Sequence, residues 1–231
     1  MAAGYHAAGE TACASFELFV RELPETRGYL VAAGLEQAIT YLETWRYTPD
    51  EIAYLRTVPA LQGADSTFFD DYLRRLRFTG DVWAVPEGTP VFAGEPILRV
   101  TAPLPEAQLV ETALLATILF QTAVASKAAR VREAAGERPV MEFGGRRAHG
   151  TQAALYAARA ACLAGCRGTS NVDAGYRFGL TLSGTMAHSW VMAHADELTA
   201  FSRYLAVHGP QSVLLIDTYD SIAAARLIVA A

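Results

Sequence analysis

The sequence predicts an α/β protein, in which a first part mixes helices with a few strands and a second part alternates strands with helices. Three observations predict this. Apolar residues alternate with period two over 14–22, they recur at helical spacing in several stretches up to residue 135, and after residue 138 short apolar runs end in polar clusters that lead into helices. The last pattern is typical of parallel strands joined by helical crossovers, in a barrel or a doubly wound sheet.

The first part of the chain is predicted to begin with a strand and continue with helices. Phe16, Leu18 and Val20 occupy alternate positions of 14–22, as in a half-buried strand. Helices are predicted over three further stretches: 35–45, a stretch that Thr48 opens, and 66–77.

Capping signals mark two of these helices. Thr48 is a good N-cap residue, with Pro49 at the first helical position and Glu51 three residues on. Ser66 is expected to cap the helix over 66–77, whose basic last residues suit the negative end of the helix dipole.

A small β unit and a long helix come next. Residues 81–102 contain short strand-type pieces separated by turn signals such as Pro86-Glu87-Gly88, which predicts an antiparallel β unit. Residues 105–135 are predicted to form one helix that is apolar on nearly every side up to Ser126. A helix of that kind lies inside a protein, so we expect it to join two layers.

After residue 138 three apolar runs are each followed by a predicted helix. The run 139–143 is followed by a helix from about residue 151, the run 180–184 by a helix from about 188, and the run 213–216 by a helix from about 221. We therefore predict an N-terminal α+β domain over 1–135, which includes the long helix, and an α/β domain over 136–231.

Composition and charge exclude several classes of protein. With 52% apolar residues, the chain of 231 residues has enough apolar surface to fold, which excludes intrinsic disorder. The net charge of −5 gives no reason to expect nucleic acid or an anionic membrane as a partner. Three cysteines do not form a disulfide framework, the first 20 residues contain no Lys or Arg, and no apolar run reaches the length of a membrane span. We predict a cytoplasmic protein.

Residues 142–150, with the sequence EFGGRRAHG, form the first candidate site. They follow a predicted strand and begin with Glu142. The glycines let the backbone turn sharply, and the guanidinium groups of Arg146 and Arg147 can bind phosphate or carboxylate. A solvated surface loop is the alternative, but ligand sites of α/β proteins gather at the carboxyl ends of strands.

A second candidate site lies at 167–175. Ser170 and Asn171 follow a glycine there and suit a turn that binds phosphate at a helix N-terminus. The pattern suits an ordinary helix cap equally well.

The third and fourth candidate sites also follow predicted strands. His188 lies at a strand-to-helix turn near Thr185 and could act as acid, base or nucleophile, although a structural histidine is the commoner outcome. Asp217 follows the apolar run 213–216, where its carboxylate could help to hold a metal–pyrophosphate; its alternative role is to cap the next helix. No residues have the spacing of a zinc site.

Taken in order, the four segments resemble the nicotinate phosphoribosyltransferase family. They read EFGGRRAHG over 142–150, GTSNVDAG over 168–175, SGTMAHSW over 183–190 and LLIDTYD over 214–220. The segments 16–39 and 85–100 resemble the same family, so that the resemblance covers nearly the whole chain. It implies an irregular α/β barrel of the type II phosphoribosyltransferases after the N-terminal domain.

The resemblance also implies an activity. Enzymes of this family join nicotinate to 5-phosphoribosyl 1-pyrophosphate, giving nicotinate mononucleotide and pyrophosphate for NAD salvage, and ATP hydrolysis drives the synthesis. Mg²⁺ would accompany ATP and phosphoribosyl pyrophosphate as the cofactor, and a homodimer is expected. Nicotinamide and quinolinate phosphoribosyltransferases are alternatives within the same fold class.

Individual residues receive roles from the resemblance. His188 is implied as the catalytic histidine that takes the phosphoryl group of ATP, and Thr185 as a nicotinate contact. We expect six further residues to bind the anionic parts of the substrates: Glu142, Arg146, Arg147, Ser170, Asn171 and Asp217.

The two ends of the chain depart from the family pattern. An Asp-Leu-Tyr-Gln stretch with a tyrosine that stacks on nicotinate would precede Met1, and further barrel strands would follow Ala231. The apolar helix predicted over 222–231 has no C-capping glycine. We therefore expect the chain to be a fragment that is inactive alone, and a catalytically silent assembly module is the alternative to an enzyme.

Overall fold

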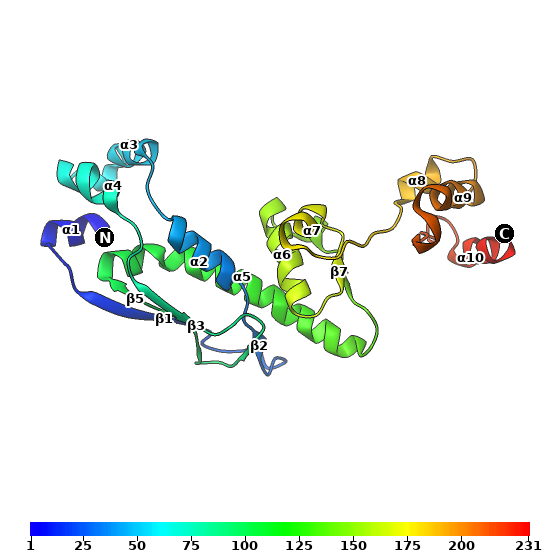
Figure 1. Cartoon of the computed structure of the whole chain (residues 1–231), viewed down its shortest axis with the longest axis horizontal. Helices are drawn as coiled ribbons and strands as arrows, with labels where there is room; N and C mark the ends of the chain where they lie inside the picture. The colour runs from blue at the N-terminus through cyan, green and yellow to red at the C-terminus, as the bar shows by residue number, and fades with distance from the viewer.

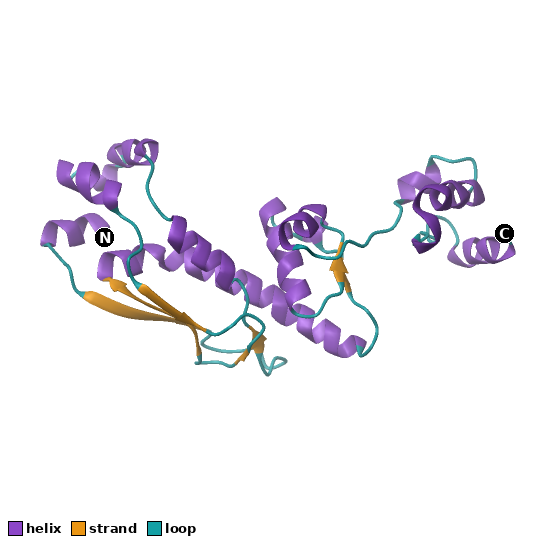
Figure 2. Cartoon of the chain, viewed as in Figure 1, coloured by secondary structure: helices purple, strands orange, loops and turns teal.

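The computed structural model describes all of residues 1–231 and has an elongated shape (Figure 1). The β-rich N-terminal part lies along one half of helix α5, which spans Leu104–Ala135. A second group of elements packs on the other half of α5. A third, all-helical group follows an extended connection at the C-terminal end (Figure 2).

The largest sheet confirms the predicted antiparallel β unit. It contains β1 (Cys13–Phe19), β5 (Pro96–Pro103) and β3 (Asp81–Ala84) in the order β1-β5-β3. Both outer strands pair antiparallel with β5, and the register shifts between Leu18 and Phe19. Two short strands, β2 (Leu30–Val31) and β4 (Pro90–Val91), form a second antiparallel pair.

The main hydrophobic core lies between this sheet and α5. Alternate residues of β5, among them Leu98, Val100 and Ala102, are buried on one face of the strand. They belong to the same core as Val110 and Leu114, which lie four residues apart on α5. The predicted long helix is confirmed, and because of its core packing it resembles the buried helix of a globular protein, although by length and composition alone it could cross a membrane.

The helices before β3 confirm one predicted cap and correct another. After α2 (Leu35–Thr44), α3 (Pro49–Thr57) begins with a complete capping box, in which the Thr48 hydroxyl accepts from the Glu51 backbone N–H and the Glu51 carboxylate accepts from that of Thr48. The hydrogen bonds of Thr48 with this carboxylate lower the pKa of Glu51, although slight desolvation opposes them.

The assignment of Ser66 as a helix cap is wrong. The Asp65 carboxylate, one residue earlier, accepts from the Phe68 backbone N–H at 2.9 Å and from the Thr67 hydroxyl. The helical stretch contains a wide turn over Phe68–Tyr72 and ends with α4 (Leu73–Arg75). The first helix of the chain, α1 (Ala2–Ala8), comes in addition to the expected elements and packs against that wide turn, while a short 3₁₀ turn (Pro59–Leu61) follows α3.

The second group of elements starts with two short parallel strands. β6 (Met141–Glu142) leads through a 3₁₀ turn (Gly145–Arg147) into α6 (Thr151–Leu163), and β7 (Gly168–Thr169) leads into α7 (Val172–Phe178). The strand expected over 180–184 is reduced to a single parallel bridge between Thr169 and Leu182.

The C-terminal group is helical and contains α8 (His188–Met192), α9 (Glu197–His208), a 3₁₀ turn (Gly209–Gln211) and α10 (Ser221–Ala230). The expectation of a strand over 213–216 is wrong, because these residues pair with no neighbouring strand. Leu214, Leu215 and Ile216 instead pack against a small core that contains Phe201 and Ala224.

Candidate functional site

Glu142, at the end of β6, organises the first candidate site. One carboxylate oxygen accepts from the Gly144 backbone N–H at 2.5 Å, and the other accepts from the Thr169 hydroxyl at 2.6 Å. The backbone carbonyl of Glu142 also accepts from the backbone N–H of Ser170. Glu142 therefore holds the loops after β6 and β7 together, with both of its carboxylate oxygens in use.

The two arginines of the first motif lie in the 3₁₀ turn between β6 and α6. The backbone N–H of Arg147 donates to the Gly144 carbonyl at 2.8 Å, which closes the turn. Both Arg146 and Arg147 are exposed, and neither forms an ion pair within the chain. Gly150, with φ of 101°, then redirects the backbone into α6, a conformation that favours glycine. The guanidinium groups are thus free to bind an anion.

A cavity of about 280 Å³ lies beside Arg147. The loop contributes Glu142, Gly144, Arg147, Ala148 and His149 to its lining, and the helices contribute Phe120 and Val124 from α5 and Ala157 from α6. Arg146 is not part of this lining. The cavity therefore combines one cationic side with an apolar wall, which suits a ligand that has an anionic group and a less polar body.

The second candidate segment lies next to the first because β6 and β7 are neighbours in the sheet. The Asn171 side chain accepts from the Ala174 backbone N–H at 3.0 Å, so that it caps α7. The Asn171 side-chain oxygen therefore acts as an ordinary helix cap, which was the alternative to phosphate binding. Ser170 is exposed, and its hydroxyl forms no hydrogen bond within the chain.

The third and fourth candidate segments meet in the C-terminal group. His188 is the first residue of α8 and is exposed, and its Nδ1 lies 3.3 Å from the Thr218 hydroxyl. The Thr185 hydroxyl, three residues earlier, donates to the Met186 carbonyl. A contact between segments 30 residues apart thus brings His188 beside the Asp-Thr-Tyr-Asp sequence.

Asp217 does not cap the following helix. The Asp220 carboxylate does so, because it accepts from the backbone N–H groups of Ile222 and Ala223, both at 2.9 Å. Asp217 is exposed and forms neither a hydrogen bond nor an ion pair through its side chain. Its carboxylate is therefore free for a ligand.

The structure gathers the candidate residues into two places and does not bring all of them together. Five lie around β6 and β7: Glu142, Arg146, Arg147, Ser170 and Asn171. Three lie around the start of α8 in the C-terminal group: Thr185, His188 and Asp217. The extended connection before α8 separates the two places (Figure 1).

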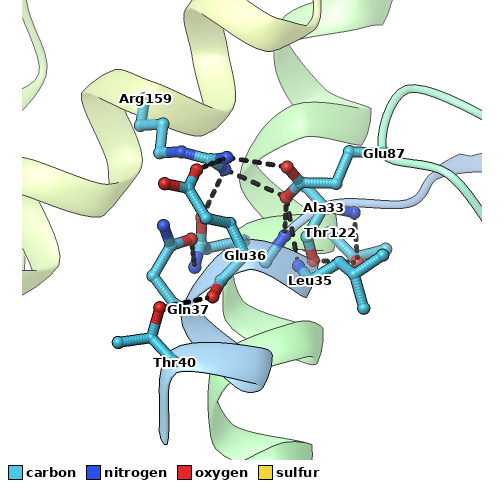
Figure 3. A network of polar contacts seen from close by, with 10 residues as sticks. Ala33, Leu35, Glu36, Gln37, Thr40, Glu87, Thr122 and Arg159 are labelled. Carbon is cyan, nitrogen blue, oxygen red and sulfur yellow. Dashed lines mark hydrogen bonds and ion pairs between the residues drawn. The ribbon is translucent and has the colours of Figure 1, made fainter. Parts of the chain in front are cut away.

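A partly buried ion pair that the sequence patterns did not reveal joins the N-terminal part to α6 (Figure 3). The Arg159 guanidinium, on α6, donates to both carboxylate oxygens of Glu87, at 3.0 and 2.7 Å, and also to Glu36 at 2.5 Å. One Glu87 oxygen accepts from the backbone N–H groups of Gly34 and Leu35 at the start of α2. No local signal could indicate this pair, because Arg159 and Glu87 are 72 residues apart and both lie in ordinary contexts, an alanine-rich helix and a turn.

Two family models match the chain, one to each side of the last part of α5. The N-terminal domain of nicotinate phosphoribosyltransferase matches residues 1–119, and the nicotinate phosphoribosyltransferase family matches residues 139–226. Together they cover most of the sequence. The chain belongs to the nicotinate phosphoribosyltransferase family.

Individual members of this family are similar over most of the chain. A nicotinate phosphoribosyltransferase of Mycobacterium tuberculosis is 47% identical over 225 residues, which are 96% of this chain and 47% of that protein. One of Bacillus subtilis is 49% identical over 212 residues, which are 90% of this chain and 42% of that protein. The chain thus spans about half the length of these relatives.

Solved structures confirm the expected α/β fold of the phosphoribosyltransferases. Human nicotinic acid phosphoribosyltransferase superposes with a TM-score of 0.78 at 39% identity, over 84% of this chain and 39% of that one. The nicotinate-nucleotide pyrophosphorylase of Pyrococcus furiosus also gives a TM-score of 0.78, over 98% of this chain and 50% of that one. At 24% identity the second likeness concerns the fold alone.

The Arg159–Glu87 pair connects the two segments that the family models match, and it should make stability depend on pH. Partial burial raises the pKa of Glu87, but the hydrogen bonds and charge of Arg159 and the α2 backbone N–H groups outweigh it, so that the pKa lies below the usual 4.5. A carboxylate with a lowered folded-state pKa contributes stability that is complete above the unfolded-state pKa and is lost as pH falls through the folded-state value.

We expect the free energy of unfolding to decrease as pH falls below about 4.5 and part of that decrease to vanish in Glu87→Gln. Urea unfolding at a series of pH values measures this difference. Asp173→Asn, which removes an exposed carboxylate paired with Arg177 on α7, is the matched control and should keep the pH dependence of the native sequence. Identical pH profiles for Glu87→Gln and the native sequence would contradict the assignment.

Proposed function

We propose that this chain forms the phosphoribosyl pyrophosphate site and the ATP-coupling site of a nicotinate phosphoribosyltransferase. Such an enzyme joins nicotinate to 5-phosphoribosyl 1-pyrophosphate, forming nicotinate mononucleotide and pyrophosphate in NAD salvage. The observation that carries the proposal is the free Arg147 beside a half-apolar cavity, on a loop that Glu142 orders. The relatives that match at 47–49% identity carry the same activity in their names.

The first place supplies anion binding and orientation. Arg147 can bind a phosphate or pyrophosphate oxygen pair through its planar fork, and Phe120 and Val124 offer an apolar surface for the ligand body. Positive charge aimed at the pyrophosphate stabilises the negative charge that develops as the bond between ribose and pyrophosphate breaks. The exposed hydroxyl of Ser170 lies on the neighbouring loop and can add a hydrogen bond.

Mg²⁺ is the cofactor that this chemistry implies, and the donor groups suit a cation that arrives with its phosphate ligand. No three His, Cys, Asp or Glu side chains are grouped to bind a metal ion by themselves. Mg²⁺ is commonly held by one or two carboxylates together with substrate phosphates and water. Asp217, whose carboxylate is free, lies in the same place as His188 and would supply a protein ligand for the Mg²⁺ that arrives with ATP, where the cation would neutralise phosphate charge.

The second place supplies a nucleophile for ATP. In the tautomer with the proton on Nδ1, His188 donates to the Thr218 hydroxyl 3.3 Å away and leaves the Nε2 lone pair available. Nε2 attacks the γ-phosphorus, so that an N–P bond forms, the bond to the bridging oxygen breaks, and ADP leaves. Hydrolysis of the phosphohistidine then returns the imidazole.

We further propose that the protein is cytoplasmic and forms a homodimer.

A replacement experiment tests this function, because the chain matches only about half of each relative. We would replace the matching residues of the Mycobacterium tuberculosis relative with this chain and assay synthesis from nicotinate, phosphoribosyl pyrophosphate, ATP and Mg²⁺. We expect nicotinate mononucleotide and ADP to form, whereas the 231-residue chain alone should bind phosphoribosyl pyrophosphate without turnover.

Two other outcomes would favour the alternatives. Use of quinolinate without ATP would indicate a quinolinate phosphoribosyltransferase. A folded chimera that binds none of the substrates would indicate a catalytically silent assembly module.

A further inference from the structure

The interface between α5 and α6 is built from small side chains. Ala125 and Ala160 are buried together in one cluster, and Ala128 and Ala161 in the next. Helices that meet through alanines have shallow ridges and grooves. Such helices interlock less deeply than helices with larger side chains, so that one can slide along the other more easily. Packing alone therefore leaves the register of α6 on α5 weakly determined.

The cavity beside Arg147 depends on that register. Phe120 and Val124 of α5 form one wall, and Ala157 of α6 and the loop that leads into α6 form the rest. A displacement of α6 along α5 would carry Arg147 with it and change the distance from its guanidinium to the apolar wall. The cavity has one defined shape only when α6 has one defined position.

The Arg159 side chain is well placed to define that position (Figure 3). It is 11% exposed and Glu87 is 17% exposed, so that water screens their charges little. The two parallel hydrogen bonds of a guanidinium with a carboxylate constrain direction as well as distance. Arg159 also approaches the Gln121 side-chain oxygen on α5 at 3.5 Å, and Gln121 donates to Gln37 of α2 at 2.9 Å.

The Glu87 end of the pair is itself fixed. Its carboxylate accepts from the backbone N–H groups of Gly34 and Leu35, where the positive end of α2 favours a negative charge. Gly34 has φ of 100°, and a Cβ there would lie 2.9 Å from the Thr117 carbonyl oxygen of α5, so α2 starts in close contact with α5. Arg159 is thus attached to a part of the molecule that packs closely against α5.

We propose that Arg159 is a positioning residue that sets the register of α6 on α5 through Glu87 and thereby holds Arg147 at the distance from Phe120 and Val124 that phosphoribosyl pyrophosphate requires. The choice of phosphoribosyl pyrophosphate as the ligand rests on the proposed function. Arg159 lines none of the cavity beside Arg147, so it acts through the position of the loop.

The first test measures binding of Mg²⁺–phosphoribosyl pyrophosphate to the 231-residue chain by calorimetry. Arg159→Lys keeps the charge but loses the two-pronged geometry, and we expect the dissociation constant to rise by about tenfold. Arg177→Lys is the matched control, because Arg177 makes an exposed pair with Asp173 within α7, and it should bind as the native chain does. Glu87→Gln, which keeps the shape of the side chain, should weaken binding in the same way as Arg159→Lys.

A double variant separates positioning from a general loss of structure. If Arg159 acts through Arg147, then Arg159→Lys should have no further effect on binding in an Arg147→Ala background. A purely structural role would weaken binding equally in both backgrounds. Native affinity in Arg159→Lys, or equal effects in the two backgrounds, would overturn the inference.

Hydrogen exchange of the ligand-free chain distinguishes a failure of this inference from a failure of the proposed function. We expect amide exchange over 144–154 to accelerate in Arg159→Lys and that of β1 to stay unchanged. Local acceleration in a chain whose native form does not bind phosphoribosyl pyrophosphate would refute the proposed function and support the register role. Unchanged exchange over 144–154, or faster exchange along the whole chain, would refute the register role.

Discussion

His188→Ala should abolish the transfer of the γ-phosphoryl group of ATP to the protein and with it the stimulation of synthesis by ATP. The physical reason is that His188 is the one histidine in the segments 183–190 and 214–220, which meet at the start of α8, and that Thr218 contacts only its Nδ1 and leaves Nε2 available. A weak, ATP-independent synthesis should remain, because bond breaking at the ribose depends on the arginine loop. The measurement uses γ-labelled ATP with the chimera described above, followed by peptide mapping at alkaline pH, which preserves phosphohistidine.

His194→Ala is the matched control for this experiment. His194 lies six residues further on. Its ring is tilted against that of Trp190, with 4.6 Å between the ring centroids, and its Nδ1–H donates to the Trp190 carbonyl. We expect it to keep the label and to lose some stability, whereas His188→Ala should leave the melting temperature almost unchanged, because His188 is exposed and contacts little. Label on another residue, or full ATP stimulation in His188→Ala, would show that a different group accepts the phosphoryl group.

Arg147→Ala should weaken binding of phosphoribosyl pyrophosphate by about 2 to 4 kcal/mol, which corresponds to roughly 30- to 1000-fold in the dissociation constant. The guanidinium lines the cavity and has no partner within the chain, so its removal leaves the ligand charge without its counter-charge. Arg146→Ala is the informative comparison, because Arg146 neighbours Arg147 but lies outside the cavity lining, and we expect a smaller loss.

Calorimetry with the chain and steady-state kinetics with the chimera both measure the effect of Arg147→Ala. The melting temperature serves as the control for folding, and it should not change, because Arg147 is exposed and unpaired. If the Michaelis constants for nicotinate and phosphoribosyl pyrophosphate are unchanged in Arg147→Ala, both arginines belong to a solvated surface loop and bind no substrate.

Local sequence signals determined the elements that depend on neighbours within one or two turns. The capping box of Thr48 and Glu51 and the continuous helix α5 follow from side chains that interact with residues a few positions away. The alternation of apolar residues over 14–22 indicated β1, although Leu18 is the one buried residue of that strand. The residues of the four motifs and their order along the chain also indicated the family. These predictions needed no knowledge of how distant segments meet.

The tertiary structure alone decided which distant groups pair. The residues 213–216 have the composition of a strand but pair with no neighbour, and a strand needs the hydrogen bonds of a second one. Asp65 and Asp220 cap helices where the sequence indicated Ser66 and, as an alternative role, Asp217, because the choice depends on where the backbone turns. The pairing of Arg159 with Glu87 and the cavity beside Arg147 depend on packing across α5, which brings together residues too far apart in sequence for any local pattern to report. The division of the candidate residues between two places follows from the extended connection before α8 (Figure 1).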